Sequence, residues 1–444
     1  MGHLQNKLLL ITLLIFFSFH NLFSCCYSTL EESSINNPYY DTANYRMDYY
    51  DSLPYQELSS GAGPTSPERA FNVDDYGARA DGTTDDRDAF LKAWNATCSS
   101  SSDSAAFVVP EGKTYLLKPL IFSGPCKATH VTVMIRGTLE ASKDRSDWPT
   151  DEIRTHWIKF ESVKNLLVQG GGTLDGNGDI WWQNSCKIDE SLPCIHAPTA
   201  LYFYGCQNLR VENINLRDSQ QIHMTFGYCA DVEASELTIT APEWSPNTDG
   251  IHVASTTNAH IHDCSIGTGD DCISIVNGSR NIKATNIVCG PGHGISIGSL
   301  GANHSTDHVS DVIVDNAMLT GTTNGVRIKT WQGGQGHAKN IIFKNINVHN
   351  VSNPIIINQD YCDSMIPCHE QKSAVAVSGI LYKNIKGTSA TEFALKLNCS
   401  KSVPCHDVVL QDISLEGEGG IPIHSLCRNV KWTAIGNIYP TCSS

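Results

Sequence analysis

Short apolar runs separated by turn residues recur along most of the chain. The runs are rich in Val, Ile, Leu and Thr, and Gly, Asn and Asp lie between them, which is the pattern of short β-strands joined by turns. One phrase repeats: one or two polar residues, an apolar–x–apolar triplet, often Asn or Asp, and then Ile or Leu. It runs from Asn208 to Leu216 and returns at spacings of 23, 27, 23, 30, 29, 39 and 28 residues, from Asp231, Asn258, Asn281, Asp311, Asn340, Gly379 and Asp407.

A repeat with a period between about 20 and 50 residues indicates a solenoid. A helical solenoid would need runs of about 10 or more residues at helical periodicity, and these runs are too short and too β-branched. The leucine spacing of a leucine-rich repeat is absent, whereas three short strands with their turns fill a coil of about 23 residues. We therefore predict an all-β chain folded as a single-stranded parallel β-helix. It is expected to be right-handed, because crossovers between parallel strands almost always take that hand.

One segment has a helical pattern instead. The run from Thr84 to Trp94 places its apolar residues, from Ala89 onward, in one stripe, and Thr84 is the expected N-cap. An open solenoid end exposes backbone and core, so we expect this short helix to cap the N-terminal coil. The first strand is predicted at residues 71–73, and the compact domain is predicted to start near Ala70.

The first 26 residues have the layout of a secretory signal peptide. Lys7 precedes a run from Leu8 to Phe17 that is apolar except for Thr12, and small and polar residues follow. A run of this length is too short to cross a bilayer as a helix, which needs about 20 residues, so a membrane anchor is the weaker alternative. Residues 27–69 are rich in Tyr, Ser and Asn, and we interpret them as a presequence or propeptide, or equally as an exposed linker. The β-helix domain is then predicted to cover residues 70–444.

Composition narrows the class of protein. The 444 residues are 41% hydrophobic and 17% charged, which argues for a large buried core and against a disordered chain. The formal charge of -15 argues against a nucleic-acid partner, because binding to phosphates needs a basic face. Seventeen cysteines and five N-glycosylation sequons favour an oxidising route and a secreted, extracellular protein with no membrane association; the sequons are at Asn95, Asn277, Asn303, Asn350 and Asn398.

Several cysteines are paired by proximity in the sequence and are expected to staple loops. These pairs are Cys186 with Cys194, Cys362 with Cys368 and Cys399 with Cys405, and Cys272 and Cys289 would flank one turn of the solenoid. Cys206 and Cys229 occupy equivalent positions of successive coils, where they would stack or bond, and Cys264 is predicted to be a buried free thiol. A zinc site is disfavoured because the chain has no Cys-x-x-Cys motif.

Four short polar motifs fall on successive coils. They are Asn247-Thr248-Asp249-Gly250, Gly269-Asp270-Asp271-Cys272, Gly292-His293-Gly294 and Arg327-Ile328-Lys329. Asp249 and Asp270 are 21 residues apart, Asp270 and His293 are 23 apart, and His293 and Arg327 are 34 apart. The first two intervals match one coil, so we expect these side chains to stack at about the 4.8 Å strand spacing. The third interval is one coil plus an insertion.

Each motif alone has an ordinary structural explanation. Asn-x-Asp-Gly and Gly-Asp-Asp are common in turns, a histidine between glycines usually lies in a tight turn, and Arg-x-Lys on a strand is usually a solvated face. Together, however, they stack three carboxylates that repel one another and place three basic side chains beside them. Glycoside hydrolysis needs an acid for the leaving oxygen and a base for water. The two cations suggest a sugar that carries a carboxylate.

With these motifs in this order, the chain resembles the plant polygalacturonases, pectin-degrading members of glycoside hydrolase family 28. The resemblance runs from about Phe71 to Cys442 and includes the residues that flank the motifs and the segment 358–362. It implies the pectin-lyase-like form of the predicted solenoid and an inverting hydrolase that acts on polygalacturonate in the cell wall, with no cofactor and no metal. It also implies a monomer that a proteinaceous polygalacturonase inhibitor would recognise.

Residue by residue, the resemblance makes Asp270 the general acid and Asp249 and Asp271 the groups that activate water. His293 would tune or hold the acid. The remaining residues would bind substrate: Arg327 and Lys329 through the galacturonate carboxylate, and Asn247 and Tyr361 through other contacts.

Alternatives remain at this point. A pectate lyase of the same fold would use the carboxylates for calcium and cleave by elimination. A related hydrolase would act on a rhamnose-containing or xylose-decorated backbone, which the two cations disfavour, and a non-catalytic wall-binding β-helix would not need three clustered carboxylates. Endo action is favoured over exo action, and the decision depends on whether loops such as residues 180–196 close one end of the groove.

Overall fold

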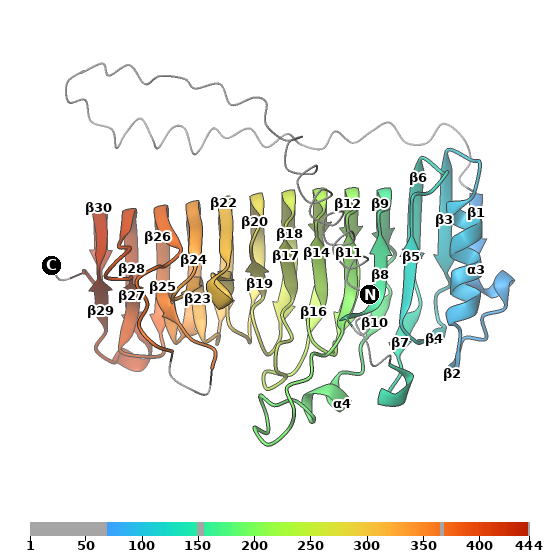
Figure 1. The fold of residues 1–444 in the computed structure, drawn as a ribbon, viewed down its shortest axis with the longest axis horizontal. Helices are drawn as coiled ribbons and strands as arrows, with labels where there is room; N and C mark the ends of the chain where they lie inside the picture. The colour runs from blue at the N-terminus through green and yellow to red at the C-terminus, as the bar shows by residue number, and fades with distance from the viewer. Residues whose placement is uncertain (1–68, 149–154, 365–367, 443–444) are drawn as a thin grey trace, which may run out of the picture. The chain divides into compact units, whose positions relative to one another are not determined.

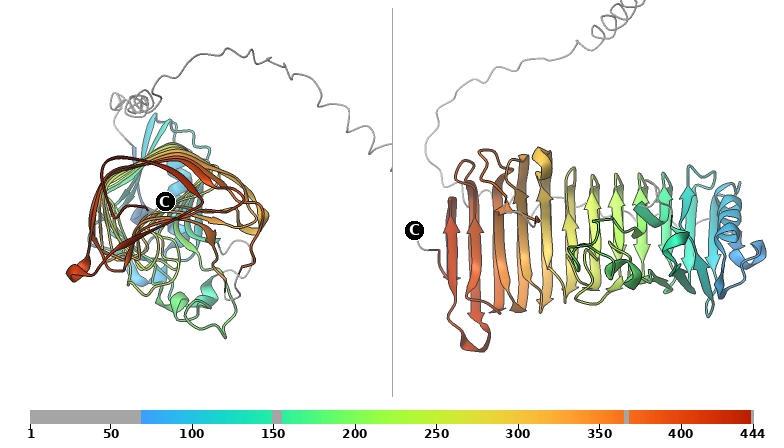
Figure 2. Two further views of the ribbon diagram at one scale, coloured as in Figure 1. Left: turned by 90° about the vertical axis from the view of Figure 1, so that its left-hand side faces the viewer. Right: turned by 60° about the horizontal axis from the view of Figure 1, so that its bottom comes forward.

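The computed structural model describes residues 69–148, 155–364 and 368–442. The expected signal peptide and most of the expected presequence therefore lie outside the described residues. Successive coils from residue 69 onward stack along one axis (Figures 1 and 2), and every strand ladder between them is parallel. The predicted right-handed parallel β-helix is confirmed.

One sheet has eleven strands, which follow one another in chain order along the solenoid axis. They are β5 (Leu120–Ser123), β8 (His156–Glu161), β11 (Thr199–Tyr204), β14 (Met224–Gly227), β17 (Ile251–Ala254), β19 (Ile273–Ile275), β21 (Ile295–Leu300), β23 (Asn324–Trp331), β25 (Asn353–Tyr361), β27 (Phe393–Asn398) and β29 (His424–Arg428). We call this the catalytic sheet, because three of the four polar motifs directly precede its strands and the fourth lies on one of them.

The other nineteen strands form a second, folded sheet. In the N-terminal coils its two faces are separate strands: β1 (Arg69–Asn72), β2 (Asp81–Asp85), β3 (Ser104–Val109), β4 (Thr114–Leu117), β6 (His130–Ile135), β7 (Thr138–Ala141), β9 (Lys164–Gln169), β10 (Thr173–Asp175), β12 (Gln207–Glu212), β13 (Asn215–Arg217), β15 (Ala230–Ser235) and β16 (Thr238–Thr240). From β18 onward one long strand covers both faces, since β18 pairs with both β15 and β16. The long strands are β18 (Thr257–Gly267), β20 (Arg280–Cys289), β22 (Thr306–Thr320), β24 (Gln335–Val351), β26 (Ala376–Ser389), β28 (Cys405–Gly417) and β30 (Val430–Tyr439).

The core is built from side chains that repeat their position in each coil. Phe160, Phe203 and Phe226 stack with ring centroids 5.4 and 5.5 Å apart. The same column continues through buried aliphatic residues in register, namely Val253, Ile275, Ile297, Ile328, Ile357 and Leu397. The period-2 alternation of each strand explains this arrangement, because every second side chain points inward at the same height.

The Asn, Asp and Gly residues that begin each repeat are turn positions with a left-handed backbone. All eight repeat anchors have φ between 52° and 65°, a conformation that Asn, Asp and Gly tolerate better than other residues. Their side chains bond from coil to coil: the amide of Asn281 donates to Asn258 at 2.9 Å, and that of Asn258 donates to Asp231 at 3.0 Å. The repeated phrase therefore marks equivalent turns of successive coils as well as equivalent strands.

Helix α3 (Arg87–Cys98) closes the N-terminal end, as predicted, but it begins later than expected. Thr84 lies in β2 rather than at the N-cap, and its hydroxyl donates to Asp81. Asp86 precedes the helix, and its carboxylate accepts from the backbone of the preceding loop. The buried side chains of Phe90 and Trp94 pack on aromatic residues of the first coils, at centroid distances of 5.0–6.3 Å.

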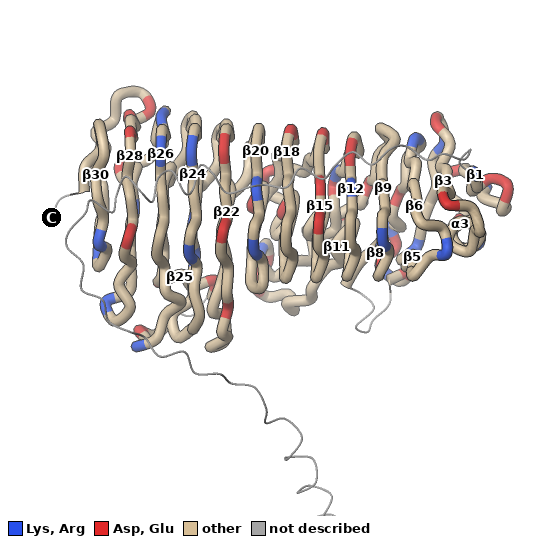
Figure 3. The backbone as a smooth tube through the Cα atoms, turned by 90° about the horizontal axis from the view of Figure 1, so that it is seen from above, with Lys and Arg blue, Asp and Glu red and all other residues tan. Residues whose placement is uncertain are grey.

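Six disulfides lie within the described residues. The four pairs expected from the sequence all form, and two further pairs, Cys98–Cys126 and Cys427–Cys442, join them near the ends of the solenoid. Cys264 is a buried free thiol, as predicted, and Cys206 and Cys229 are likewise buried and unbonded to each other. No helix among the described residues is long and apolar enough to span a membrane. Basic and acidic residues are interspersed along the backbone in the view of Figure 3.

Candidate active site

The four polar motifs meet at neighbouring strands of the catalytic sheet. Asp249 precedes β17, Asp270 and Asp271 precede β19, and His293 precedes β21, while the last motif lies on β23 itself. The structure refines the predicted column in one respect. Because Ile251 pairs with Ile273, counting back along both strands places Asp249 opposite Asp271, and Asp270 lies one position earlier in the turn.

Asp271 is the most enclosed of the three carboxylates, with a side chain only 1% exposed. Arg327 Nη2 donates to its Oδ1 at 2.6 Å, and Lys329 Nζ donates to its Oδ2 at 2.9 Å. Ser296 Oγ also donates to Oδ1, at 2.7 Å, and itself accepts from Arg327 Nε. Both oxygens of this buried carboxylate are therefore bound by positively charged side chains.

Asp270 lies at the open side of the cluster and is held by His293. His293 Nδ1 donates to Asp270 Oδ1 at 2.9 Å, and the backbone N–H of His293 donates to the carbonyl of Asp270. Asn247 Nδ2 approaches the other oxygen at 3.3 Å. Burial raises the pKa of Asp270, but the His293 hydrogen bond and nearby positive charge outweigh it and lower the pKa to about 2. The same hydrogen bond raises the pKa of His293.

Asp249 has the opposite electrostatic environment. Burial and the negative charges of Asp270 and Asp271 raise its pKa well above the usual range. Its Oδ2 accepts from Ser274 Oγ at 2.8 Å, and Ser274 Oγ in turn lies 2.8 Å from His252 Nδ1. Burial lowers the pKa of His252 to about 4, so this histidine is a neutral hydrogen-bond partner. Of the two carboxyl groups with opposite shifts, Asp249 therefore has the raised pKa and Asp270 the lowered one.

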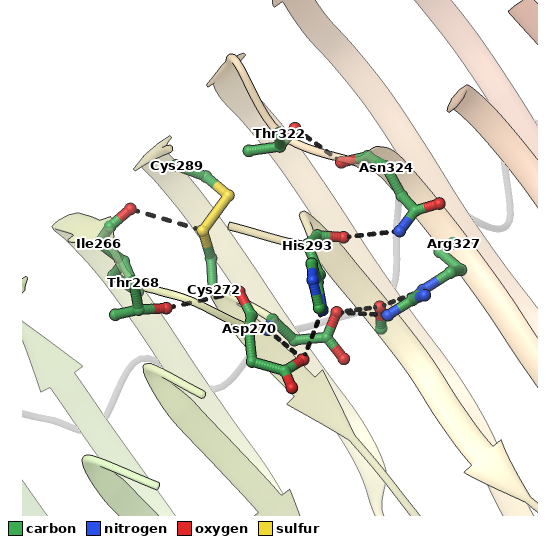
Figure 4. Close-up of a disulfide and its surroundings, with 11 residues drawn as sticks. Ile266, Thr268, Asp270, Cys272, Cys289, His293, Thr322, Asn324 and Arg327 are labelled. Carbon is green, nitrogen blue, oxygen red and sulfur yellow. Dashed lines mark hydrogen bonds and ion pairs between the residues drawn. A yellow bond between two sulfur atoms is a disulfide. The ribbon is translucent and has the colours of Figure 1, made fainter. Parts of the chain in front are cut away.

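A disulfide fixes the turns that carry these groups. Cys272 follows Asp271 directly, and its partner Cys289 lies four residues before His293. Figure 4 shows the disulfide behind Asp270 and His293, with Arg327 approaching from the neighbouring strand. Covalent closure of a short loop restricts how far these two turns can separate.

The other predicted substrate contacts also line the cleft. Tyr361 ends β25, and Lys329 Nζ lies 5.3 Å from the centroid of its ring. Burial raises the pKa of Tyr361. The cleft has a volume of about 490 Å³, and all eight residues selected from the sequence line it.

Several side chains in or directly beside this cleft were not found from the sequence. Ser274 and Ser296 bind the carboxylates, and their signal was present as the tripeptide Ile-Ser-Ile at the same position of two successive coils. Lys187 and Asp363 line the cleft from distant loops and pair with each other at 2.5 Å. Nothing in the sequence links positions 176 residues apart, although each lies next to a cysteine of a loop disulfide.

The loop that carries Lys187 follows the short helix α4 (Asp179–Trp182), and both project from the edge of the solenoid (Figure 1). The question of whether residues 180–196 approach the groove is therefore answered in part. The loop reaches the cleft through Lys187, and a second hollow of about 260 Å³ lies under it.

One group of potential metal ligands overlaps this site. Ligand atoms of Asp270, Asp271 and His293 lie within 4.8 Å of one another. Both oxygens of Asp271 are already bound by Arg327 and Lys329, and His293 donates to Asp270. Calcium prefers a set of oxygen ligands without competing cations, so these residues do not fit the calcium site that a pectate lyase would need.

A parallel β-helix with three carboxylates and two cations in one surface cleft defines a class of polysaccharide-cleaving enzymes. Residues 98–438 match the family described as Glycosyl hydrolases family 28, and the chain belongs to this family. It is a glycoside hydrolase.

Named relatives agree with this assignment. The chain is 57% identical over 379 residues to a polygalacturonase of Persea americana, covering 85% of this chain and 81% of the relative. It is 52% identical over 410 residues to the polygalacturonase QRT2 of Arabidopsis thaliana, covering 92% of each chain.

Solved structures share the fold at lower identity. An exopolygalacturonase from Thermotoga maritima superposes with a TM-score of 0.70 at 22% identity, covering 84% of this chain and 91% of that one. An endo-xylogalacturonan hydrolase from Aspergillus tubingensis also gives 0.70, at 23% identity, covering 83% and 100%. An exo-acting and an endo-acting enzyme are equally similar, so the fold alone does not separate these modes of action.

Proposed function

We propose that this protein is a polygalacturonase that hydrolyses the α-1,4 bonds between galacturonate units of de-esterified pectin. The observation that supports this most directly is the placement of Arg327 and Lys329 beside the carboxylate cluster in one cleft. Two cations next to catalytic carboxylates select a substrate that is itself acidic. The plant relatives named polygalacturonase point to the same substrate.

In this mechanism Asp270 is the general acid, and Asp249 and Asp271 activate the attacking water. Arg327 and Lys329 bind the carboxylate of the sugar beyond the scissile bond, while Asn247 and Tyr361 position the chain. The reaction proceeds with inversion, so water is activated on the face of the sugar opposite the acid. His293 positions Asp270 rather than reacting itself.

The proton distribution of the free protein explains how Asp270 can become an acid. Without substrate, the raised pKa lies on Asp249, and Asp270 is kept ionised by His293 and Lys329. A galacturonate carboxylate bound at Lys329 neutralises part of that positive charge and excludes water. Both changes raise the pKa of Asp270, and the proton of the coupled cluster then moves to the residue that faces the leaving oxygen.

Product analysis on polygalacturonate tests this proposal. Hydrolysis yields saturated oligomers, whereas elimination yields unsaturated ends that absorb in the ultraviolet. A chelator should leave the activity unchanged, because no step uses a metal. Ultraviolet-absorbing products, or loss of activity with chelator, would instead support a lyase.

We further propose endo action on cell-wall pectin by a secreted monomer, which a proteinaceous polygalacturonase inhibitor would recognise. The disulfides support an oxidising compartment, and four of the five sequon asparagines are exposed. Early formation of mixed oligomers from long polygalacturonate is expected. Release of monomer alone would favour an exo enzyme.

A further inference from the structure

The outer face of the catalytic sheet continues beyond the cleft toward the N-terminal coils. Outward side chains form two rows across its strands, and strand pairing fixes their register. One row contains Lys159, Tyr202, Thr225, His252, Ser274, Ser296 and Arg327, from β8 to β23. The second row, next to it, contains Glu161, Tyr204, Gly227 and Ala254. We call Arg327 and Lys329 the clamp. The row that contains Arg327 on β23 therefore also contains Lys159 and Tyr202, which lie on β8 and β11 toward the N-terminus.

Three tyrosines gather at the N-terminal end of these rows. The rings of Tyr202 and Tyr204 have centroids 5.9 Å apart, and those of Tyr204 and Tyr228 are 5.4 Å apart. Tyr228 is 63% exposed, and the other two are partly exposed. We call Tyr202, Tyr204, Tyr228 and Lys159 the tyrosine platform.

Neighbouring residues hold the platform in place. Lys159 Nζ lies 4.6 Å from the Tyr204 ring centroid and 5.9 Å from that of Tyr202, and it donates to Glu161 at 2.6 Å. Tyr202 packs over Gly227, where an added Cβ would lie 2.7 Å from the tyrosine hydroxyl. The absence of a side chain at this position leaves the space that the ring occupies. Rigid aromatic side chains with an apolar face and a polar tip are suited to bind a ligand that is also partly apolar and partly polar.

We propose that the tyrosine platform binds distal sugar units of the same galacturonan chain that is cut at the cleft. The proposal rests on the polygalacturonase activity proposed above. The strand β11 lies two strands from β17, at a distance of about 10 Å, and a pyranose unit in an extended chain advances by about one strand spacing. A chain held by Arg327 and laid along the rows therefore reaches the platform with units well beyond the scissile bond.

Charge distinguishes this subsite from the clamp. Lys159 is paired with Glu161, so the platform has no surplus cation. In the clamp, by contrast, two cations, Arg327 and Lys329, share the single carboxylate of Asp271. At the platform, the tyrosine ring faces and hydroxyl groups bind the sugar units. It therefore accepts esterified as well as free galacturonate units, while the clamp requires a free carboxylate.

The test uses Tyr204→Ala and Tyr228→Ala in the full-length protein, with Tyr439→Ala as the matched control. Tyr439 is 53% exposed and lies on β30 of the other sheet. On long polygalacturonate, each platform variant should lose about three- to tenfold in kcat/KM, mainly through KM. On digalacturonate, which spans only the scissile bond and is too short to reach the platform, the variants should match wild type. Equal losses on both substrates, or no loss on the long one, would overturn the proposal.

A binding measurement separates this inference from the proposed function. The Asp270→Asn protein, with and without Tyr204→Ala, is run through gels that contain polygalacturonate, partly methyl-esterified pectin or hydroxyethylcellulose. The platform predicts weaker retardation of the double variant in both pectin gels and none in the neutral glucan. Unchanged retardation in pectin, or retardation in the glucan, would overturn it. Failure of the proposed function would appear differently, as wild-type protein that does not hydrolyse polygalacturonate at all.

Discussion

A ladder of left-handed residues at the bends of the long strands, formed by Asp263, Asn286 and Asn316, and the carboxylate cluster of the cleft both stack polar side chains from one coil onto the next. In the ladder each amide donates to its neighbour, as Asn286 does to Asp263 at 2.9 Å and Asn316 does to Asn286 at 2.7 Å. In the cleft three acids lie together, and none can donate to another while all are ionised. The ladder side chains satisfy one another's hydrogen-bonding groups. The carboxylate cluster instead depends on Arg327 and Lys329 of β23, two strands further along the sheet than β19.

This difference shows what each arrangement does. The ladder residues have left-handed backbones and exposed side chains, and they set the height of the bends. The cleft residues raise the pKa of Asp249 and lower that of Asp270, so neighbouring carboxyl groups have unlike proton affinities. Groups with such divided pKa values are typical of acid–base catalysis. Substitutions in the two regions should therefore affect different measurements.

The largest effect is expected at the acid. Asp270→Asn removes the proton donor but keeps the shape of the side chain, so turnover on polygalacturonate should fall about 10²–10⁴-fold. The unfolding midpoint in urea should change little, because this side chain lies at the open side of the cluster. A loss of activity below tenfold would refute the assignment of Asp270.

Much of this comparison could be predicted from the sequence, because both regions repeat with the coil. The repeat anchors predicted the β-helix, and the four motifs predicted which side chains meet, since residues one coil apart must stack. The helix boundary was wrong because Thr84 is used by a strand, a tertiary outcome that local propensity cannot show. Lys187 and Asp363 could not be found, because their meeting depends on two irregular loops with no common period.

The next largest effect is expected at the clamp. Charge-assisted hydrogen bonds contribute about 1.5–3 kcal/mol each, so Lys329→Ala should lower kcat/KM on polygalacturonate by about 10- to 150-fold. Part of the loss will appear in kcat, because Lys329 also holds Asp271. Wild type should prefer de-esterified over esterified pectin, and the variant should lose that preference. Lys344→Ala, a cation of the other sheet that pairs with Asp315, is the control; equal wild-type rates on both pectins would contradict the clamp.

A smaller effect is expected from the pH dependence. Activity should follow a bell with its maximum at roughly pH 4–6. The acidic limb reports protonation of the water-activating carboxylates, and the alkaline limb reports loss of the shared proton or of the charge on His293, whose pKa is raised. In His293→Ala the positive charge that lowers the pKa of Asp270 is gone, so the pKa of this acid rises and the alkaline limb moves to higher pH. His308→Ala, on the other sheet, should keep the wild-type limbs, and a flat profile from pH 5 to pH 8 would show that no such coupled cluster operates.

The smallest effect on catalysis is expected in the ladder, where stability alone should respond. Asn286→Gly removes two exposed amide contacts but keeps a residue that adopts the φ of 57°, so it should lower the free energy of unfolding by about 0.5–1.5 kcal/mol. Ala tolerates the left-handed backbone less well than Asn or Gly, so Asn286→Ala should cost about 1–2 kcal/mol more. Urea unfolding measures the free energy of unfolding of both variants. Their kcat/KM should stay within about twofold of wild type, because Asn286 lies on β20 and contacts no cleft residue that binds substrate. If Asn286→Gly and Asn286→Ala were equally stable, the bend would not require its left-handed residue. If either lost activity in proportion to stability, the ladder and the cleft would not be the independent regions that their contacts indicate.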